Sequence, residues 1–297
     1  MKITPVLLGL SLAAAGISLA AAQDASTSSI PAVLTITREY VKPYKAGMAH
    51  DKTETAFAAA FRKGNYPAYY IGLNSMSGRS RALYLTSYAS FAEWEKDTKV
   101  IAKNPALNAD LEHVGLADGD LLDQLDSVVF TYDAELSYHS HADVSHARYF
   151  ELTAFHVRPG KSKEWHMVSK MYRDLMDQAN PDAHWAMFDV AYGADGGSYV
   201  SLTAINSMAE IDQANAAFGK VFEAAGGPDG WDKIDKAFGD AVDTYHSELF
   251  SVNPRQSYVS EDWIKADDFW KPKPAKAGAE SAAAKPAKPA PAAKPGS

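Results

Sequence analysis

Cysteine is absent from this sequence of 297 residues. No disulfide, thiolate metal site, cysteine nucleophile or cysteine-linked lipid can therefore form. Because no covalent cross-link is available, the fold must be stabilised by its core alone. A chain of about two domain lengths can bury enough apolar surface to do so.

Long hydrophobic runs are also missing beyond the N-terminus, so we expect no transmembrane segment. The first residues are Met1-Lys2, an apolar run over residues 6–15, and Ala20-Ala21-Ala22. A basic start, a short apolar stretch and an Ala-x-Ala end are typical of a secretory signal peptide. We predict a signal peptide over residues 1–22, cleavage near Ala22, and a periplasmic or secreted protein.

Excess positive charge is lacking as well, because the formal net charge is −8. Six lysines and one acid lie in the Ala/Lys/Pro-rich tail, residues 271–297, so the rest of the chain is more acidic still. An acidic body argues against a nucleic-acid partner. The tail is too poor in apolar residues to fold. It is interpreted as a disordered spacer, or as a weak contact to an anionic envelope surface.

One short sequence pattern occurs twice. Residues 37–45 read Thr-Arg-Glu-Tyr-Val-Lys-Pro-Tyr-Lys, and residues 153–161 read Thr-Ala-Phe-His-Val-Arg-Pro-Gly-Lys. Further matches follow in the same order, and they predict a duplicated unit. The predicted segments are an N-terminal lead (23–32), a first repeat (33–138), a linker (139–147), a second repeat (148–258) and a docking segment (259–270).

Hydrophobic periodicity predicts the same order of elements in both repeats, β-α-β-β-α-β with an extra helix before the last strand. The predicted strands are 33–41, 66–76, 81–88, 127–132, 148–158, 184–192, 198–205 and 245–252. The predicted helices are 48–63, 91–103, about 105–126, 162–178, a helix opening at Ser207, and 229–244.

This order is that of the ferredoxin-like split βαβ unit, which leaves one sheet face uncovered by helices. Two such faces in one chain can pack together. We therefore predict an α+β fold in which two tandem ferredoxin-like units form a pseudo-dimeric α/β barrel with a lumen between them.

The strand that ends Val157-Arg158-Pro159-Gly160-Lys161, and the later Ser207-x-Ala209-Glu210, resemble the dimeric α/β-barrel superfamily. That group includes NIPSNAP-like, EthD-like and antibiotic-monooxygenase-like domains, and the chain is similar to tandem secreted bacterial members. The resemblance covers residues 33–258. It implies the fold and leaves the function open, since members include cofactor-free oxygenases, haem enzymes, isomerases and ligand binders.

Strand alternation sorts the side chains onto two faces. We predict that the apolar set, which includes Leu34, Leu83 and Val200, lies under the helices. The opposite, aromatic and polar set then faces the lumen. Such a lining suits a small organic ligand, although it could equally fill a solid seam between the sheets. The ligand-binding candidates are Tyr70, Asn74, Tyr84 and Trp185.

Four residues are candidates for catalysis. Burial would raise the pKa of Glu39, Glu151 or Asp189 and could make one of them a general base. His156 stands where the first repeat has Tyr40, as expected for a single site in a pseudo-dimer. The ordinary alternative is that these acids are exposed strand residues.

Cofactors are not expected, with haem as the alternative. A haem would need an axial imidazole, for which the candidates are His156, His166 and His184. No metal is expected either, and His139 and His141 of the linker are only weak candidates.

Three functions stay open at this point. The first is an exported protein that binds a small molecule between the repeats or is purely structural. The second is a cofactor-free oxygenase or isomerase-like enzyme acting in the same lumen. The third is an envelope interaction module that acts through the basic tail.

Overall fold

The computed structural model describes residues 30–140 and 143–271. The predicted signal peptide, most of the N-terminal lead, the tail beyond Lys271 and His141 lie outside the described residues. Among the helices of the described ranges, none is both long and apolar enough to span a bilayer.

The first unit runs from the first strand to a long fourth strand. Its elements are β1 (Val33–Val41), α1 (Met48–Lys63), β2 (Tyr70–Ser75), β3 (Arg81–Tyr88), α2 (Phe91–Lys103), α3 (Pro105–Gly119) and β4 (Leu122–Tyr138).

The second unit repeats this order after a short 3-10 helix and is followed by a C-terminal segment. Its elements are η1 (Val144–His146), β5 (Tyr149–Val157), α4 (Ser162–Ala179), β6 (Trp185–Tyr192), β7 (Ser198–Ile205), α5 (Met208–Ala224), α6 (Gly227–Ala241) and β8 (Val242–Val252). The C-terminal segment comprises α7 (Glu261–Ala266) and η2 (Asp268–Trp270).

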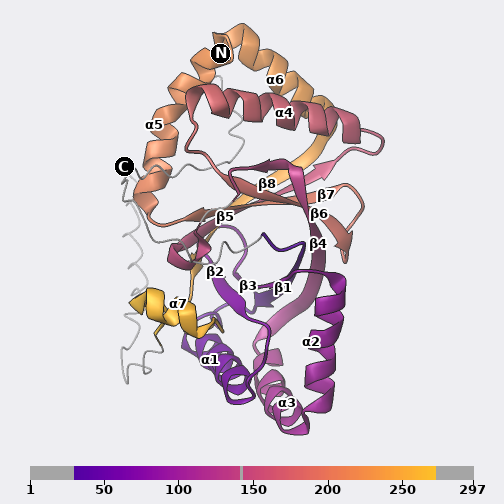
Figure 1. Ribbon diagram of the computed structural model, residues 1–297, viewed down its shortest axis with the longest axis vertical. Helices are drawn as coiled ribbons and strands as arrows, with labels where there is room; N and C mark the ends of the chain where they lie inside the picture. The colour runs from indigo at the N-terminus through magenta and orange to yellow at the C-terminus, as the bar shows by residue number, and fades with distance from the viewer. Residues whose placement is uncertain (1–29, 141–142, 272–297) are drawn as a thin grey trace, which may run out of the picture.

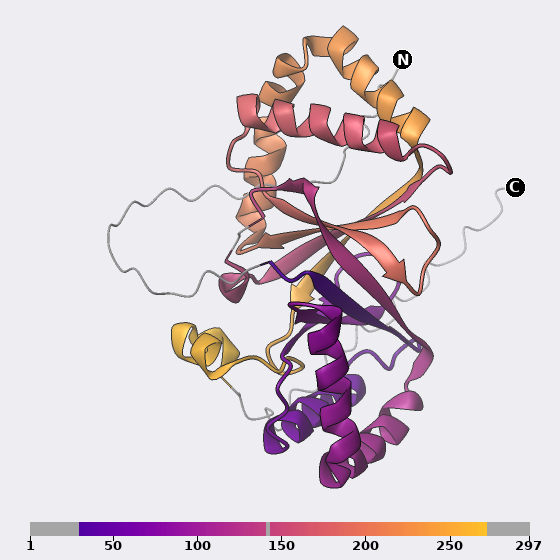
Figure 2. The same cartoon turned by 45° about the vertical axis from the view of Figure 1, so that its right-hand side comes forward.

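The strands form one closed barrel in the order β1-β3-β2-β8-β5-β7-β6-β4, and β4 pairs with β1 to close it. Within each unit the strand order is that of a ferredoxin-like sheet, and the units join through the β2–β8 and β4–β6 pairs. Helices α4–α6 cover one end of the long axis and α1–α3 the other, with the barrel between them (Figures 1 and 2). The predicted fold class is confirmed.

Local sequence explains where several helices begin. Ser90 precedes α2 and its Oγ accepts a hydrogen bond from the Glu93 backbone N–H at 3.2 Å, as a capping residue should. The Asn104 side chain caps α3 in the same way, receiving the Leu107 N–H at 3.1 Å, and Pro105 occupies the first turn.

Strand β4 differs most from its predicted bounds. The sequence predicts a strand over residues 127–132, whereas β4 covers residues 122–138 and α3 ends at Gly119. The strand is long because its first part pairs with β1 and its last part pairs with β6. A strand shared by two units needs twice the usual length, and no local periodicity marks this.

The predicted assignment of sheet faces is wrong. Residues such as Leu34, Leu83 and Val200, expected under the helices, form one cluster that spans both units and fills the barrel interior. The other face packs against α1 and α3 in the first unit and against α4–α6 in the second. Alternation separates two faces but does not say which one meets helices. The barrel interior, shared by both sheets, takes the more uniformly aliphatic face.

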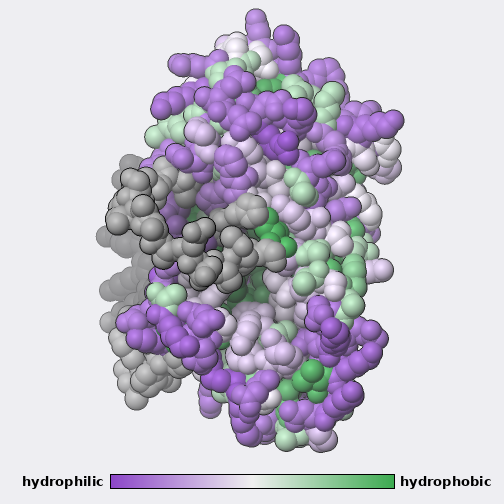
Figure 3. Space-filling view, in the orientation of Figure 1, coloured by the Kyte–Doolittle hydropathy of each residue, from purple (hydrophilic) through white to green (hydrophobic). Residues whose placement is uncertain are grey.

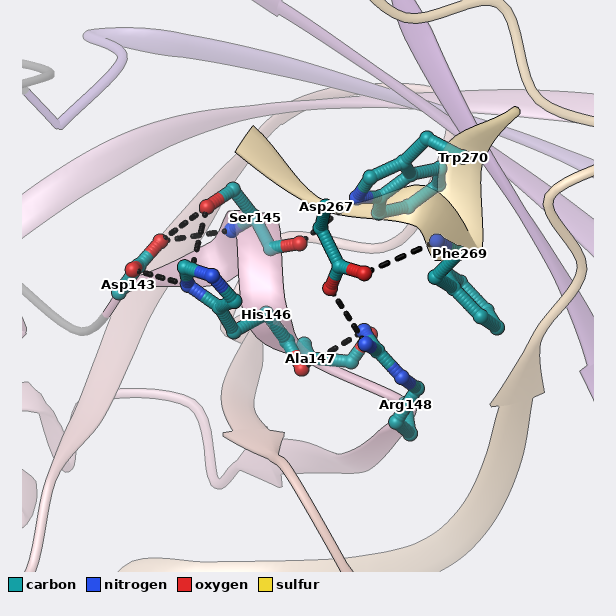
Figure 4. A network of polar contacts seen from close by, with 8 residues as sticks. All are labelled: Asp143, Ser145, His146, Ala147, Arg148, Asp267, Phe269 and Trp270. Atoms are coloured by element: carbon teal, nitrogen blue, oxygen red, sulfur yellow. Dashed lines mark hydrogen bonds and ion pairs between the residues drawn. The ribbon is translucent and has the colours of Figure 1, made fainter. Parts of the chain in front are cut away.

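The C-terminal segment packs against the start of the second unit (Figure 4). The Trp270 indole N–H donates to the Ser145 carbonyl at 2.7 Å, and the Arg148 guanidinium pairs with the Asp267 carboxylate. Trp263 and Trp270 lie with ring centres 5.3 Å apart. Because both rings adjoin the cluster inside the barrel, this segment closes one side of the interior.

Candidate functional site

A cavity of about 820 Å³ opens at one mouth of the barrel. Its apolar wall comes from interior-facing side chains of both units and from the C-terminal segment, so it lies where three parts of the chain meet. Hydrophobic residues are visible in the hollow near the middle of the molecule in Figure 3. Its main apolar lining residues are Leu34, Ile71, Leu85, Phe150, Ala186, Phe188, Leu202 and Trp263.

One buried carboxylate belongs to the lining of this cavity. Asp97 of α2 is only 5% exposed and accepts hydrogen bonds from the Tyr66 and Tyr88 hydroxyls through Oδ2. Its other oxygen, Oδ1, is buried and has no hydrogen-bond partner among the described residues. Burial, and then the hydrogen bond to Asp97, raises the pKa of both tyrosines, so both remain neutral donors. Asp97 Oδ1 is therefore an unpaired acceptor beside the cavity.

The rim carries charge. Lys96 and Glu93 of α2 line the cavity and form an ion pair at 2.6 Å, with both side chains at least half exposed. Exposed pairs of this kind contribute little to stability, so they can rearrange around an entering molecule at small cost.

Two of the four predicted ligand-binding residues line the cavity. Tyr70 and Trp185 do so, although both belong mainly to the helix-covered faces. Tyr84 lies behind Tyr70, with ring centres 5.8 Å apart, and does not line the cavity. Asn74 lies at the β2–β8 junction, where its carbonyl accepts from Ser251 Oγ at 3.5 Å.

None of the four predicted catalytic residues lines the cavity. Glu151 accepts from Thr153 Oγ1 at 3.5 Å, and His156 is half-buried near the end of β5. Asp189 of β6 is half-buried, and partial burial, together with nearby Asp133, raises its pKa. The structure does not bring these residues together.

Glu39 instead belongs to a second buried site, under the helices of the first unit. His50 Nε2 lies 2.9 Å from Glu39 Oε2, 4.0 Å from Glu54 Oε1 and 3.8 Å from Asp118 Oδ1. All four side chains are buried, and one donor atom from each lies within 4.8 Å of the others. We call Glu39, His50, Glu54 and Asp118 the acid–histidine cluster.

The pKa values of two carboxyl groups in this cluster, Glu54 and Glu39, are raised. Burial, and then the charge of Glu39, raises the pKa of Glu54 to about 9. Burial also raises the pKa of Glu39, against the opposing effect of the His50 hydrogen bond. Asp118 accepts a hydrogen bond from Thr53 Oγ1 at 2.6 Å, which fixes its orientation.

The sequence reading identified only Glu39 of this cluster. A usable signal was present, since His50 and Glu54 are four residues apart on the helix after Glu39 and so share one face. Asp118 comes from α3, far along the chain, and only the packing of α3 on α1 brings it near.

The histidines considered as metal or haem ligands lie outside the acid–histidine cluster. His139 stacks on Tyr138, with ring centres 3.9 Å apart. His166 of α4 is exposed beside Glu135 at 3.4 Å. His184 lines the cavity, but its Nε2 lies 2.9 Å from the Ala204 carbonyl and is occupied by that hydrogen bond. Among the described residues, Lys96 and His184 are the basic side chains that line the cavity, so a haem would find few partners for its two propionates there.

Comparisons with known proteins show similarity at the level of structure. No protein-family model and no curated protein matches the chain. A proposed monooxygenase from Fusobacterium nucleatum is similar with a TM-score of 0.50 and 9% identity, over 76% of this chain and 93% of that one. An anthrone oxidase-like protein gives a TM-score of 0.48 and 14% identity, over 76% and 93%. A haem-binding protein from Thermus thermophilus gives 0.42 and 9%, over 80% and 95%.

At such low identity these similarities concern the fold alone. This chain has the dimeric α/β-barrel, ferredoxin-like fold, which confirms the resemblance drawn from its sequence. That it is a secreted member of the group stays a prediction.

Proposed function

We propose that this protein, a dimeric α/β barrel built within one chain, binds a small and mainly apolar organic molecule between its two units. The observation that supports this most strongly is the cavity of about 820 Å³ lined by both units and by the C-terminal segment. Ligand pockets of proteins fall in this range of volume, with apolar walls and few polar groups.

The polar groups narrow the ligand class. Asp97 Oδ1 is an unpaired acceptor beside a mainly apolar wall, so a ligand whose hydroxyl or amine donor reaches it would satisfy it. Aromatic side chains in the lining, Phe150, Phe188 and Trp185 among them, favour a flat or aromatic body. We therefore infer an aromatic or polycyclic ligand that carries a hydrogen-bond donor.

Binding is favoured over turnover. The oxygenase or isomerase alternative required a candidate acid or His156 in the same space as the ligand, and the cavity lining contains none of them. Asp97 is held by two tyrosine hydroxyls, an arrangement suited to orienting a ligand.

Fluorescence titration with 2-naphthol tests this proposal. The probe has an aromatic body and one donor, and wild-type protein should bind it saturably with one site per chain. Replacing Ala186, which lines the cavity, by Phe should weaken binding by at least about tenfold because the added ring occupies the space. The matched control is Ala154→Phe, since Ala154 is exposed on β5 and does not line the cavity.

A second probe isolates the role of Asp97. The analogue 2-methoxynaphthalene has the same body and no donor, so it should bind more weakly than 2-naphthol by up to about tenfold, the value of one hydrogen bond. Equal binding of both probes would contradict the assigned role of Asp97. Equal weakening by Ala186→Phe and Ala154→Phe would contradict the cavity as the site.

The haem alternative has a direct readout. Haem added to the purified protein would give a shifted Soret band if an imidazole ligated its iron. Because His184 donates through Nε2, only its Nδ1 could ligate the iron. We expect no such band, because the cavity offers few basic side chains to the two propionates.

The proposed ligand would be met outside the cytoplasm. We infer export from the signal-peptide pattern of residues 1–22. The mass of the mature protein, recovered from the producing cell, should correspond to a chain that begins at Gln23. Cell fractionation with and without residues 271–297 tests whether the basic tail adds an envelope contact.

A further inference from the structure

We propose that the acid–histidine cluster of the first unit is a binding site for one divalent transition-metal ion. Its ligands are Glu39 from β1, His50 and Glu54 from α1, and Asp118 from α3. The site is separate from the ligand cavity, whose lining includes none of these residues.

The spacing of the donor atoms fits an ion at their centre. Metal–nitrogen and metal–oxygen bonds of about 2.0–2.2 Å place neighbouring tetrahedral ligands about 3.3–3.6 Å apart. The distances from His50 Nε2 to the three carboxylate oxygens are 2.9, 4.0 and 3.8 Å, which bracket that value. Side-chain shifts of less than about 1 Å would complete the coordination, as flexible carboxylates allow.

An unsatisfied atom points independently to a missing partner. Glu54 is 3% exposed, and its Oε1, the atom that faces His50, has no hydrogen-bond partner among the described residues. The buried hydroxyl of neighbouring Tyr84 lies near the Glu54 and Glu39 carboxyl groups without forming a hydrogen bond of normal geometry. Buried polar atoms are nearly always satisfied, so an unpaired carboxylate oxygen beside an imidazole indicates an absent ligand.

The charge balance favours a cation. The cluster places three carboxyl groups around one imidazole, and all four side chains are buried. Burying ionised carboxyl groups without a counter-ion is costly, and a divalent ion offsets two negative charges.

The fold itself does not require this cluster. In the second unit the corresponding space between sheet and helices is filled by an aromatic core that includes Phe155, Trp165 and Phe238. The first unit places four polar groups where a hydrophobic core would serve stability better. A specific role explains this difference between the two units.

The ligand set indicates the class of ion. One imidazole with carboxylates suits Zn²⁺, Mn²⁺ or Fe²⁺, whereas Ca²⁺ and Mg²⁺ prefer oxygen ligands alone. Thr53, which donates to Asp118 Oδ1, acts as a positioning residue that orients this ligand.

Calorimetric titration of the chelator-treated full chain with Zn²⁺, and separately with Mn²⁺, tests the proposal. We expect one ion per chain for at least one metal, and a raised Tm when that metal is present. His50→Gln and Glu54→Gln should each weaken binding by about 100-fold or more and abolish the rise in Tm. Both variants should fold, because each removes a buried ionisable group and keeps a similar shape.

Two matched controls locate the site. Glu210→Gln changes another buried glutamate, in the second unit, whose Oε2 accepts the Asn206 N–H at 3.0 Å. The double variant His139→Ala/His141→Ala removes the linker histidines. Both controls should bind the ion as wild type does. The absence of stoichiometric binding, or binding that survives His50→Gln and Glu54→Gln, or binding lost in the linker variant, would overturn the proposal.

Discussion

At the scale of single residues, the most informative side chains are buried polar ones. Asp97 and Glu54 each hold an oxygen that nothing in the described chain satisfies, and each marks a different site. Tyr70 adjoins both sites, since it lines the cavity and burial, followed by the charge of Glu54, raises its pKa.

The sequence allowed single candidate residues to be chosen, but it did not show which side chains would lie next to them. Glu39 was identified because an acid on a strand is unusual when buried. His50, Glu54 and Asp118 were missed because each is ordinary on a helix surface. The cluster exists only through the packing of α1 and α3 on β1, which no local pattern encodes.

Asp267 provides a pH-dependent prediction. The Phe269 backbone N–H, and then the Arg148 guanidinium, lower the pKa of Asp267 below its usual 3.8. A lowered pKa means that the folded state favours the carboxylate. The stabilisation is therefore fully present above about pH 3.8 and is lost as pH falls through the lower, folded-state pKa.

The Trp270 indole N–H resonance, which reports the bond to Ser145, should therefore shift only in acid. In Asp267→Asn it should be shifted already at neutral pH. The control is Asp262→Asn, because Asp262 is exposed and lies 3.7 Å from Lys265. An unchanged resonance in Asp267→Asn would show that the pair does not hold the C-terminal segment in place.

At the scale of elements, the bounds predicted from the sequence lie close to the observed bounds for strands and helices that pack within one unit. The helix caps at Ser90 and Asn104 were readable because the capping residues lie next to the helices they begin. The bounds of β4 could not be read from the sequence, because its length depends on a second pairing partner, β6 of the other unit.

The β6–β7 turn gives a prediction at this scale. Gly193 has a φ of +86°, and a Cβ there would meet the Ser127 carbonyl oxygen at 2.4 Å. Gly193→Ala should therefore lower the free energy of unfolding by about 1–3 kcal/mol, since both strain and overlap with β4 must be relieved. Denaturant unfolding measures the loss.

Gly196 of the same turn is the matched control. It lacks a positive φ, and a Cβ there would meet nothing within 4 Å. Gly196→Ala should leave stability unchanged or raise it slightly, because alanine restricts the unfolded chain. Equal losses for both variants would contradict the close approach of this turn to β4.

At the scale of the whole molecule, two ferredoxin-like units close one barrel and share its interior. The sequence predicted this architecture because the order of elements recurs. It did not predict which sheet face turns inward, because both faces carry enough apolar residues to form a core.

The junction between units contains a buried ion pair that tests this closure. Arg81 of β3 pairs with Glu248 of β8, and the Glu248 side chain is 5% exposed. Arg81→Met would leave a buried carboxylate without its main partner, at a cost of about 3–5 kcal/mol in the free energy of unfolding. Arg79→Met is the control, since Arg79 is 55% exposed and 3.7 Å from Asp123, and it should cost less than about 1 kcal/mol.

If Arg81→Met costs no more than Arg79→Met, the two units are not joined as described. A large cost for Arg81→Met in a single cooperative transition would show that both units unfold together.

The central claim is that both units line one ligand-binding space. Methyl NMR of the protein titrated with 2-naphthol tests it most directly. We expect shifts together at Leu34 and Leu85 of the first unit and Leu202 of the second, with Leu107 and Leu175, in the helix-covered cores, unchanged. Shifts confined to one unit, or to Leu107 or Leu175, would contradict the account.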